Sequence, residues 1–337
     1  MSLPQDAAAL ARYLREATGA RQASIRELRR LPEGAVQENW RVEVEFAGGD
    51  LDGSRSLVLR KDAATSLGLG LDRAGEFQVA RTAHAAGVST PEPLLLCTER
   101  TVIGSPFFVM RRISGEAAPQ RIVSGALGGE RTDLAAALAR EMAAIHAVAP
   151  PCATLACLGA PPADAAGARL AQCAGLLADD PEPHPVAEWG LRWLDRHRPP
   201  PAAPVLCHGD FRTGNFLADD RGLTAILDWE FAGWSDPDED IGWFCLGCWR
   251  FGAYEREAGG IVPRPVFIDA YERASWRRID PARLRWWETM AALRWLALAL
   301  RQRDRALIGG ELSLDLALTG RRVAECEFEI LKLTGAL

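Results

Sequence analysis

The chain has 337 residues, enough for two domains that each bury a hydrophobic core. Hydrophobic residues make up 48% and charged residues 25% of the sequence, which argues against a disordered chain or a fibrous repeat. The 39 basic and 45 acidic side chains give a net charge of -6, which argues against non-specific nucleic-acid binding.

The first third of the chain has the pattern of a strand-rich unit. Residues 1–19 predict a short amphipathic helix rather than a leader for export, because they lack a basic start followed by an apolar run. Residues 71–86 have helical spacing and end at Gly87. Between Ala23 and Lys61, alternating and β-branched stretches such as Trp40–Phe46 and Ser56–Leu59 predict antiparallel strands. Two more strand-like segments follow, at Leu94–Cys97 and Pro106–Arg112.

From about Thr132 onward, alanine- and leucine-rich periodicity predicts long helices, for example at 133–148 and 281–303. Proline- and alanine-rich stretches at 150–167 and 199–204 predict loops. The predicted fold class is therefore α+β. We expect a strand-bearing domain at residues 1–112 that ends in a hinge strand, and a helical domain at residues 113–337.

The most apolar stretch, Met290–Leu300, contains Arg294 and is about half as long as a membrane span requires. No membrane association is therefore expected. Eight cysteines without an export signal indicate reduced thiols and a cytoplasmic protein.

The cysteines do not have the spacing of a zinc site. Cys245 and Cys248 form a C-x-x-C, but no second pair and no histidine pair accompanies them. Cys152, Cys157 and Cys173 also have the wrong spacing. All five are predicted to be buried apolar thiols.

A polar segment between two apolar stretches has the pattern of a catalytic turn. Residues 205–217 begin and end with apolar strands, and the polar turn between them contains Asp210 and Asn215. A further strand, predicted at 223–227, leads directly into Asp228. The three oxygen-bearing side chains are expected to meet at one edge. As isolated residues they would be read as turn formers, but their spacing and the flanking strands favour a catalytic role.

These three side chains are suited to phosphoryl transfer, because an enzyme for that reaction mainly positions the reactants and neutralises charge on phosphate oxygens. Asp210 can accept the proton of an acceptor hydroxyl as the catalytic base. Asn215 and Asp228 offer the hard oxygen atoms that Mg²⁺ prefers.

The motif H-G-D-x-x-x-x-N, followed by I-L-D-W-E, resembles the aminoglycoside phosphotransferase and choline kinase superfamily, whose two-lobed fold is protein-kinase-like. The resemblance covers nearly the whole chain. Val58–Arg60 and Phe108–Gly115 look most like the phosphotransferase domains related to those fused to acyl-CoA dehydrogenases. A loop that covers the phosphates is implied within residues 31–39.

The resemblance implies a small-molecule kinase that uses ATP and Mg²⁺ in a cleft between the lobes. Its acceptor would be a hydroxyl compound: a hydroxylated acyl compound or similar metabolite, an amino alcohol, a sugar or an antibiotic. The rival hypothesis is a catalytically silent nucleotide-binding protein with a regulatory role, against which Asp210, Asn215 and Asp228 argue.

For the nucleotide, the resemblance implies that Arg60 grips the phosphates with Glu76 as its ion-pair partner. The adjacent Lys61 is the alternative, because neighbouring side chains on a strand point to opposite faces. The backbone of Val109 and Met110, in the hinge strand, is implied to meet adenine.

Three further polar features have alternative interpretations. His208 is predicted to buttress the turn rather than act as a base. In the acidic run 236–240, Asp240 is implied to support the catalytic loop, while a solvated helix start is the alternative. His146 is predicted to be a packed or capping histidine, with substrate contact as the alternative.

Many tryptophans lie in the second half of the chain, and their spacing predicts core residues. The alternative is that some line the acceptor pocket, where an aromatic cage could hold a quaternary ammonium or an apolar chain. The residues concerned are Trp234, Trp243, Trp249, Trp286, Trp287 and Trp295.

Overall fold

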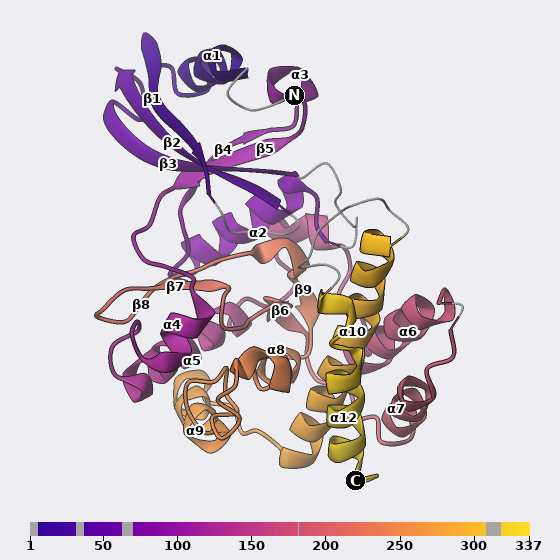
Figure 1. Ribbon diagram of the computed structural model, residues 1–337. Coiled ribbons are helices and arrows are strands. Elements are labelled where there is room, and N and C mark those ends of the chain that lie inside the picture. The colour runs from indigo at the N-terminus through magenta and orange to yellow at the C-terminus, as the bar shows by residue number, and fades with distance from the viewer. Residues whose placement is uncertain (1–5, 32–36, 63–69, 181, 308–317) are drawn as a thin grey trace. The chain divides into compact units, whose positions relative to one another are not determined.

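A computed structural model gives the fold, and it describes residues 6–31, 37–62, 70–180, 182–307 and 318–337 (Figure 1). The chain divides into two compact units, one of residues 1–85 and 90–113 and the other of residues 86–89 and 114–337. The first unit is built on an antiparallel sheet and the second is mainly helical. The predicted α+β fold class is thus confirmed.

The sheet of the first unit has five antiparallel strands in the order β1-β2-β3-β5-β4. All four predicted strand segments lie in this sheet, and the predicted helix 71–86 corresponds to α2. The strands are β1 (Gln22–Arg30), β2 (Gln37–Ala47), β3 (Gly53–Asp62), β4 (Pro93–Cys97) and β5 (Phe107–Arg111). The helices are α1 (Ala7–Ala17), α2 (Arg73–Ala85) and α3 (Arg100–Ile103).

The two faces of this sheet have different partners, because side chains alternate along each strand. Leu57 and Leu59 of β3 join an apolar cluster with α1. Arg60 pairs in register with Phe108 of β5 and points to the opposite face. There Phe108 meets Phe77 of α2, with ring centroids 6.0 Å apart. Arg60 therefore lies on the α2 side of the sheet.

The second unit contains two short antiparallel ladders within a helical body (Figure 1). Its strands are β6 (Val205–Cys207), β7 (Phe216–Ala218), β8 (Leu223–Ile226) and β9 (Gly233–Ser235), with β6 paired to β9 and β7 to β8. Its helices are α4 (Pro119–Ser124), α5 (Arg131–His146), α6 (Ala165–Ala178), α7 (Pro185–Arg196), α8 (Asp238–Phe244), α9 (Arg264–Ser275), α10 (Pro281–Leu307) and α12 (Val323–Thr334).

The helices predicted at 133–148 and 281–303 are α5 and α10. The loop predicted at 150–167 is only partly correct, because a 3-10 helix occupies Ala153–Leu158 and α6 already begins at Ala165. Asp164 starts α6 as an N-cap, since its side chain accepts a 2.9 Å hydrogen bond from the Gly167 amide.

A tight turn of the chain at the start of the second unit requires glycine. Gly115 has φ of 130°, and a Cβ there would lie 2.6 Å from Thr224 Oγ1. The neighbouring Glu116 forms a β-bridge with Ala218, so this segment is held against the β7–β8 hairpin.

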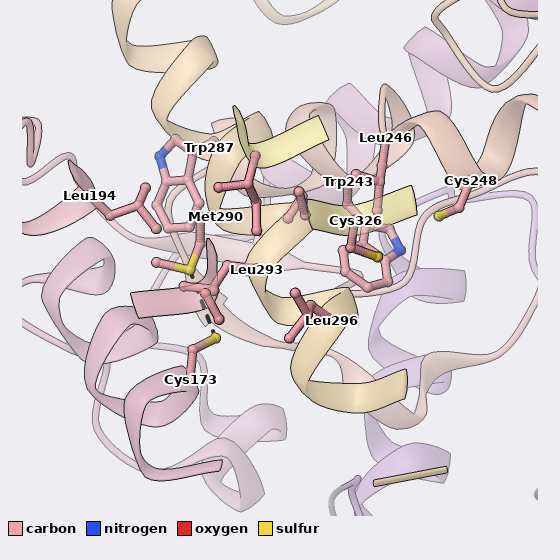
Figure 2. Close-up of a cluster of buried hydrophobic side chains, with 14 of the residues drawn as sticks. Cys173, Leu194, Trp243, Leu246, Cys248, Trp287, Met290, Leu293, Leu296 and Cys326 are labelled. Carbon is pink, nitrogen blue, oxygen red and sulfur yellow. Dashed lines mark hydrogen bonds between the residues drawn. The ribbon is translucent and has the colours of Figure 1, made fainter. Parts of the chain in front are cut away.

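The main apolar core of the second unit lies among α6, α7, α8, α10 and α12 (Figure 2). Trp243, Trp249, Trp286 and Trp287 are buried in it, and Trp295 packs against it. Trp234, in β9, is also buried. This burial favours the core interpretation of the tryptophans. Met290–Leu300 belongs to α10, and none of the helices in the described part of the chain has the length and apolarity to cross a lipid bilayer.

The cysteines are all free thiols. Cys245, Cys248 and Cys173 are buried, as predicted. The prediction is wrong for Cys157, which is exposed, and for Cys152, which is half-buried. Both belong to the segment around the 3-10 helix, in which Leu155 is the buried residue.

Candidate active site

The β7–β8 hairpin brings Asn215 and Asp228 to one end of a small ladder. Phe216 pairs with Ile226, so the residue before β7 and the residues after β8 meet. The Leu227 amide donates a 2.8 Å hydrogen bond to the Asn215 carbonyl. Asp228 follows directly, with φ of 70°, a left-handed conformation that aspartate tolerates better than most side chains. Such unusual backbone geometry is often found at functional sites.

Asp210 is buried at this site and receives hydrogen bonds from three side chains. Trp243 Nε1 donates to Oδ1 at 2.7 Å, and Asn215 Nδ2 donates to Oδ2 at 2.6 Å. Arg212 Nε lies 3.1 Å from Oδ1 and 3.3 Å from Oδ2. The carboxylate is therefore fixed in orientation by its neighbours.

Asp240 binds the backbone of the turn that contains Asp210. Its fully buried carboxylate accepts hydrogen bonds from the amides of His208 (2.7 Å) and Gly209 (2.8 Å), and from His146 Nε2 (3.1 Å). Burial alone would raise the pKa of Asp240, but the hydrogen bonds from His146 and from the His208 amide hold that pKa below its usual range. The carboxylate therefore stays ionised and keeps its bonds to the turn.

His208 connects the turn to the strand that carries Asp228. Its Nε2 donates to the Leu227 carbonyl at 2.9 Å, and its Nδ1 accepts from the Asp210 amide at 3.2 Å. These partners require the neutral tautomer with the hydrogen on Nε2. The ring packs against Trp229 and Phe211. Both nitrogens are used in structural bonds, as a buttress would use them.

His146 is packed inside the second unit, as predicted. Besides Asp240, it contacts the Tyr271 hydroxyl at 2.7 Å. Burial raises the pKa of Tyr271 above its usual range. The hydroxyl therefore keeps its proton and can donate a hydrogen bond.

The acidic run 236–240 is not a solvated helix start, so that alternative is wrong. Its carboxylates are buried, because basic residues from other helices reach them. Arg283 of α10 contacts both Asp236 and Asp238, and Arg169 of α6 lies 2.8 Å from Glu239.

Arg212 and Arg294 were not predicted as site residues, and Trp243 was predicted only as a core residue or part of an acceptor pocket. Arg294 appeared only as an interruption of an apolar stretch, yet its Nη1 donates to the Gly209 carbonyl at 2.8 Å. Its guanidinium also stacks on the Trp243 ring, 4.6 Å from the centroid. A lone charge in an otherwise apolar helix was the available signal, because a buried charge requires partners.

In the first unit, Arg60 and Glu76 form a buried ion pair, with Nε and Oε1 2.9 Å apart. Glu76 is shared, since Arg73 Nη1 also binds its other oxygen. Arg73 in turn lies 2.9 Å from Asp62 Oδ1. Arg73 was not predicted as a site residue, although its position three residues before Glu76 on a helix favours such a contact.

Lys61 lies on the other face of β3, where it pairs with Glu38 at 3.2 Å. The side chains of Arg60 and Lys61 therefore point to opposite faces of the sheet, as predicted. Of the two, only Arg60 faces α2. The predicted phosphate-covering loop falls largely on residues 32–36, which lie outside the described residues.

Val109 and Met110 lie in β5, which has a neighbour on each side. Val109 pairs with Leu59 of β3 and with Leu95 of β4. A nucleotide base would have to use backbone groups that these two ladders leave free, so the hinge role of Val109 and Met110 stays a prediction.

The residues at the hairpin end fit a magnesium ion by their chemistry. Asn215 Nδ2 donates to both the carbonyl and Oδ2 of Asp210, at 3.0 and 2.6 Å, which fixes the amide orientation. Its side-chain oxygen therefore points away from Asp210. Together with the half-buried carboxylate of Asp228, it supplies the hard oxygen ligands that Mg²⁺ prefers.

The α+β fold and the turn with Asp210 define the class of kinase-like phosphotransferases. A family model described as "Phosphotransferase enzyme family" matches residues 27–287. The chain belongs to this family, which confirms the resemblance read from the motifs.

Relatives in sequence include acyl-CoA dehydrogenase family member 10 of Mus musculus, 28% identical over 251 residues, or 73% of this chain and 22% of that protein. Acyl-CoA dehydrogenase family member 11 of Rattus norvegicus is 28% identical over 296 residues, or 80% of this chain and 36% of that protein. The chain thus spans about a fifth to a third of the length of these relatives.

Solved structures share the fold at low identity. A Ralstonia eutropha protein assigned to the aminoglycoside phosphotransferases has a TM-score of 0.73 at 19% identity, with 98% of each chain covered. A choline/ethanolamine kinase family protein from Mesorhizobium loti gives 0.58 at 21%, with 92% of each covered. A thermostable mutant of aminoglycoside phosphotransferase APH(4)-Ia, in complex with ADP and hygromycin B, gives 0.59 at 19%, with 97% of this chain and 98% of that one covered.

Proposed function

We propose that this protein transfers the γ-phosphate of ATP to a hydroxyl group of a small molecule in a magnesium-dependent reaction. The observation that carries the proposal is the side-chain group at the end of the β7–β8 hairpin. There Asp210 is hydrogen-bonded to Asn215, and Asp228 follows the neighbouring strand. Membership of the phosphotransferase family supports this assignment.

In the proposed reaction, the acceptor oxygen forms a bond to the γ-phosphorus, and the bond from that phosphorus to the bridging oxygen of ADP breaks. Asp210 takes the proton of the acceptor hydroxyl as its oxygen attacks. Asn215 and Asp228 would hold magnesium, which when bound neutralises charge on the phosphate oxygens. His208 and Asp240 keep the turn in shape.

In the first unit, Arg60 is proposed to bind phosphate oxygens, for which a guanidinium is well suited. Glu76 orients Arg60, and Arg73 anchors Glu76. The backbone of Val109 and Met110 is proposed to meet the adenine ring. ADP bound to a structural relative supports nucleotide binding by this fold.

For the acceptor, the likeness to acyl-CoA dehydrogenase family members favours a hydroxylated acyl compound or similar metabolite. Amino alcohols, sugars and antibiotics are the other candidates. They are supported by the choline/ethanolamine kinase family protein and by hygromycin B in the APH(4)-Ia complex.

The test is a screen of hydroxyl compounds from these four classes with magnesium and either ATP or GTP, read by nucleoside diphosphate release and by mass spectrometry of the product. The expected result is a phosphorylated product with the parent protein and almost none with Asp210→Asn. Nucleotide-induced thermal stabilisation without any product would instead support the catalytically silent regulatory protein.

A further inference from the structure

The hydrogen bonds at Asp210 distinguish its two oxygens. An ionised carboxylate has about four lone-pair sites, two on each oxygen. Trp243 Nε1 at 2.7 Å and Arg212 Nε at 3.1 Å occupy Oδ1. Oδ2 has one close donor, Asn215 Nδ2 at 2.6 Å, and a longer contact to Arg212 at 3.3 Å. Oδ2 is therefore the better placed to accept a further proton donor.

Trp243 reaches Asp210 from the same helix that fixes the catalytic turn. Asp240 and Trp243 are three residues apart on α8, so their side chains lie on one face of the helix. Asp240 binds the amides of His208 and Gly209, while Trp243 binds the side chain of Asp210. One helix thus holds both the backbone and the carboxylate of the turn.

The indole of Trp243 is itself held rigidly. It is 2% exposed and lies within the apolar cluster of the second unit (Figure 2). Arg294 stacks on its ring at 4.6 Å, and Trp249 and Trp295 pack against it with centroids 5.7 and 6.2 Å away. A buried ring with these neighbours has little freedom to turn its N–H away from Asp210.

The simpler interpretation is that Trp243 is a core residue whose N–H happens to find an acceptor. Its neighbours argue against this. Within the described part of the chain, Nε1 of Trp249, Trp287 and Trp295 is buried without a hydrogen-bond partner. Burial in this cluster therefore does not by itself bring an indole N–H to a protein acceptor, and the bond from Trp243 to Asp210 is a specific contact.

We propose that Trp243 is a positioning residue for phosphoryl transfer, whose indole N–H holds Asp210 Oδ1 so that Oδ2 faces the acceptor hydroxyl. This inference rests on the proposed function, because it gives Asp210 the role of base. Trp243 acts through Asp210 and does not itself touch the reacting atoms.

The experiment compares Trp243→Phe with a matched control, Trp286→Phe. Trp286 is equally buried in the same cluster, and its Nε1 donates to the Leu194 carbonyl instead of to Asp210. The substrate is the hydroxyl compound that the parent phosphorylates fastest in the screen. We expect kcat of Trp243→Phe to fall on the order of 10- to 100-fold, because misplacing a catalytic group is costly. The KM for ATP should stay within about threefold of the parent, as should both constants of the control.

A second comparison uses the Asp210→Asn background. If Trp243 acts through the base, Trp243→Phe should add almost no further loss of kcat there, since the two residues work as one unit. A full additional loss in that background, or equal kinetics of Trp243→Phe and Trp286→Phe in the parent, would overturn the inference and leave the proposed function standing. A parent protein without turnover on any compound would overturn the proposed function and this inference with it.

Because Trp243→Phe could fail to fold, the contact is also tested with Trp243 intact. The ¹⁵N-labelled indole N–H resonances of the eleven tryptophans are compared between the parent and Asp210→Ala. We expect one indole N–H resonance to move strongly upfield when its acceptor is lost. Indole spectra that coincide would show that no tryptophan is bonded to Asp210, and would overturn the inference.

Discussion

At the scale of single residues, the proposed base is defined as much by its neighbours as by the motif. The motif places Asp210 and Asn215 at a fixed spacing, and the structure shows that Asn215 orients Asp210 directly. Asn215 thus has two proposed roles, as a donor to the base and as a metal ligand.

Asp210→Asn should leave folding and ATP affinity nearly unchanged and lower kcat on the order of 100- to 10,000-fold, the usual contribution of a general base. Asparagine keeps the size of the side chain and one acceptor oxygen for Trp243 and Arg212, and it loses only the acceptor for Asn215 Nδ2. Steady-state kinetics and nucleotide titration check this. A kcat within a few-fold of the parent would remove Asp210 from the role of base.

Asp228→Ala should weaken magnesium-dependent ATP binding more than Asn215→Ala, because losing a charged ligand costs more than losing a neutral one. Asp228 has a positive φ, so Asp228→Asn is the control that removes the charge while keeping a side chain suited to that backbone. Magnesium titrations of all three variants provide the measurement. Parent-like metal dependence in each would exclude both residues from the metal site.

Arg60→Ala should reduce catalysis strongly and Glu76→Ala partly, whereas Lys61→Ala should be mild because Lys61 pairs with Glu38 on the other face. The Arg60 and Glu76 effects should be non-additive, since either change breaks the same ion pair. Kinetics of the single and double variants test this. If Lys61→Ala reduces catalysis and Arg60→Ala does not, Lys61 and not Arg60 binds the phosphates.

At the scale of elements, α8 decides the geometry of the catalytic turn. Its seven residues carry both Asp240 and Trp243, and its position depends on a close approach to α10. At Gly242 an added Cβ would lie only 2.7 Å from the Trp287 backbone. A glycine is therefore required in the middle of this helix, although alanine has the higher helix propensity.

Gly242→Ala should destabilise the protein by about 1 to 3 kcal/mol, the usual cost of overpacking, and lower activity because α8 must shift. The matched control is Gly175→Ala in α6, where a Cβ would meet nothing within 4 Å. There alanine should be neutral or stabilise by up to about 1 kcal/mol. Urea unfolding monitored by circular dichroism measures both. Equal effects at the two glycines would mean that α8 and α10 are not closely packed.

At the scale of the whole molecule, buried charges connect the helices of the second unit. Asp236 and Asp238 meet Arg283 of α10 at the start of α8. Burial, and then the charge of Asp236, raise the pKa of Asp238 to about 7, against the opposing effect of Arg283 and Arg277. Between these two pKa values, the folded protein keeps a proton on Asp238 that the unfolded chain, with a pKa of 3.8 at this residue, has released.

Because the folded pKa of Asp238 lies above the unfolded one, its contribution to stability falls as pH rises from about 4 to 7 and is constant above that. Asp238→Asn should remove this loss. The difference in free energy of unfolding between the variant and the parent should therefore shift in favour of the variant by about 1 to 4 kcal/mol from pH 5 to pH 8.

Urea unfolding of parent and variant at both pH values measures the difference. The exposed Asp195→Asn serves as the control for a general effect of removing a carboxylate. A stability difference for Asp238→Asn that does not change with pH would contradict the assignment of a raised pKa.

The features that depend on local spacing could be predicted from the amino-acid sequence alone. The H-G-D-x-x-x-x-N turn, the strand leading to Asp228, the sheet strands and the long helices follow from patterns a few residues apart. The ion pair of Arg60 with Glu76 also followed, through the family resemblance. Only the tertiary structure showed that Trp243, Arg294 and Arg73 support these groups and that the acidic start of α8 is buried. Trp243, Arg294 and the acidic start of α8 reach their partners through packing between elements, so their spacing along the chain carries no signal. Arg73 differs, because it lies three residues before Glu76 on the same helix.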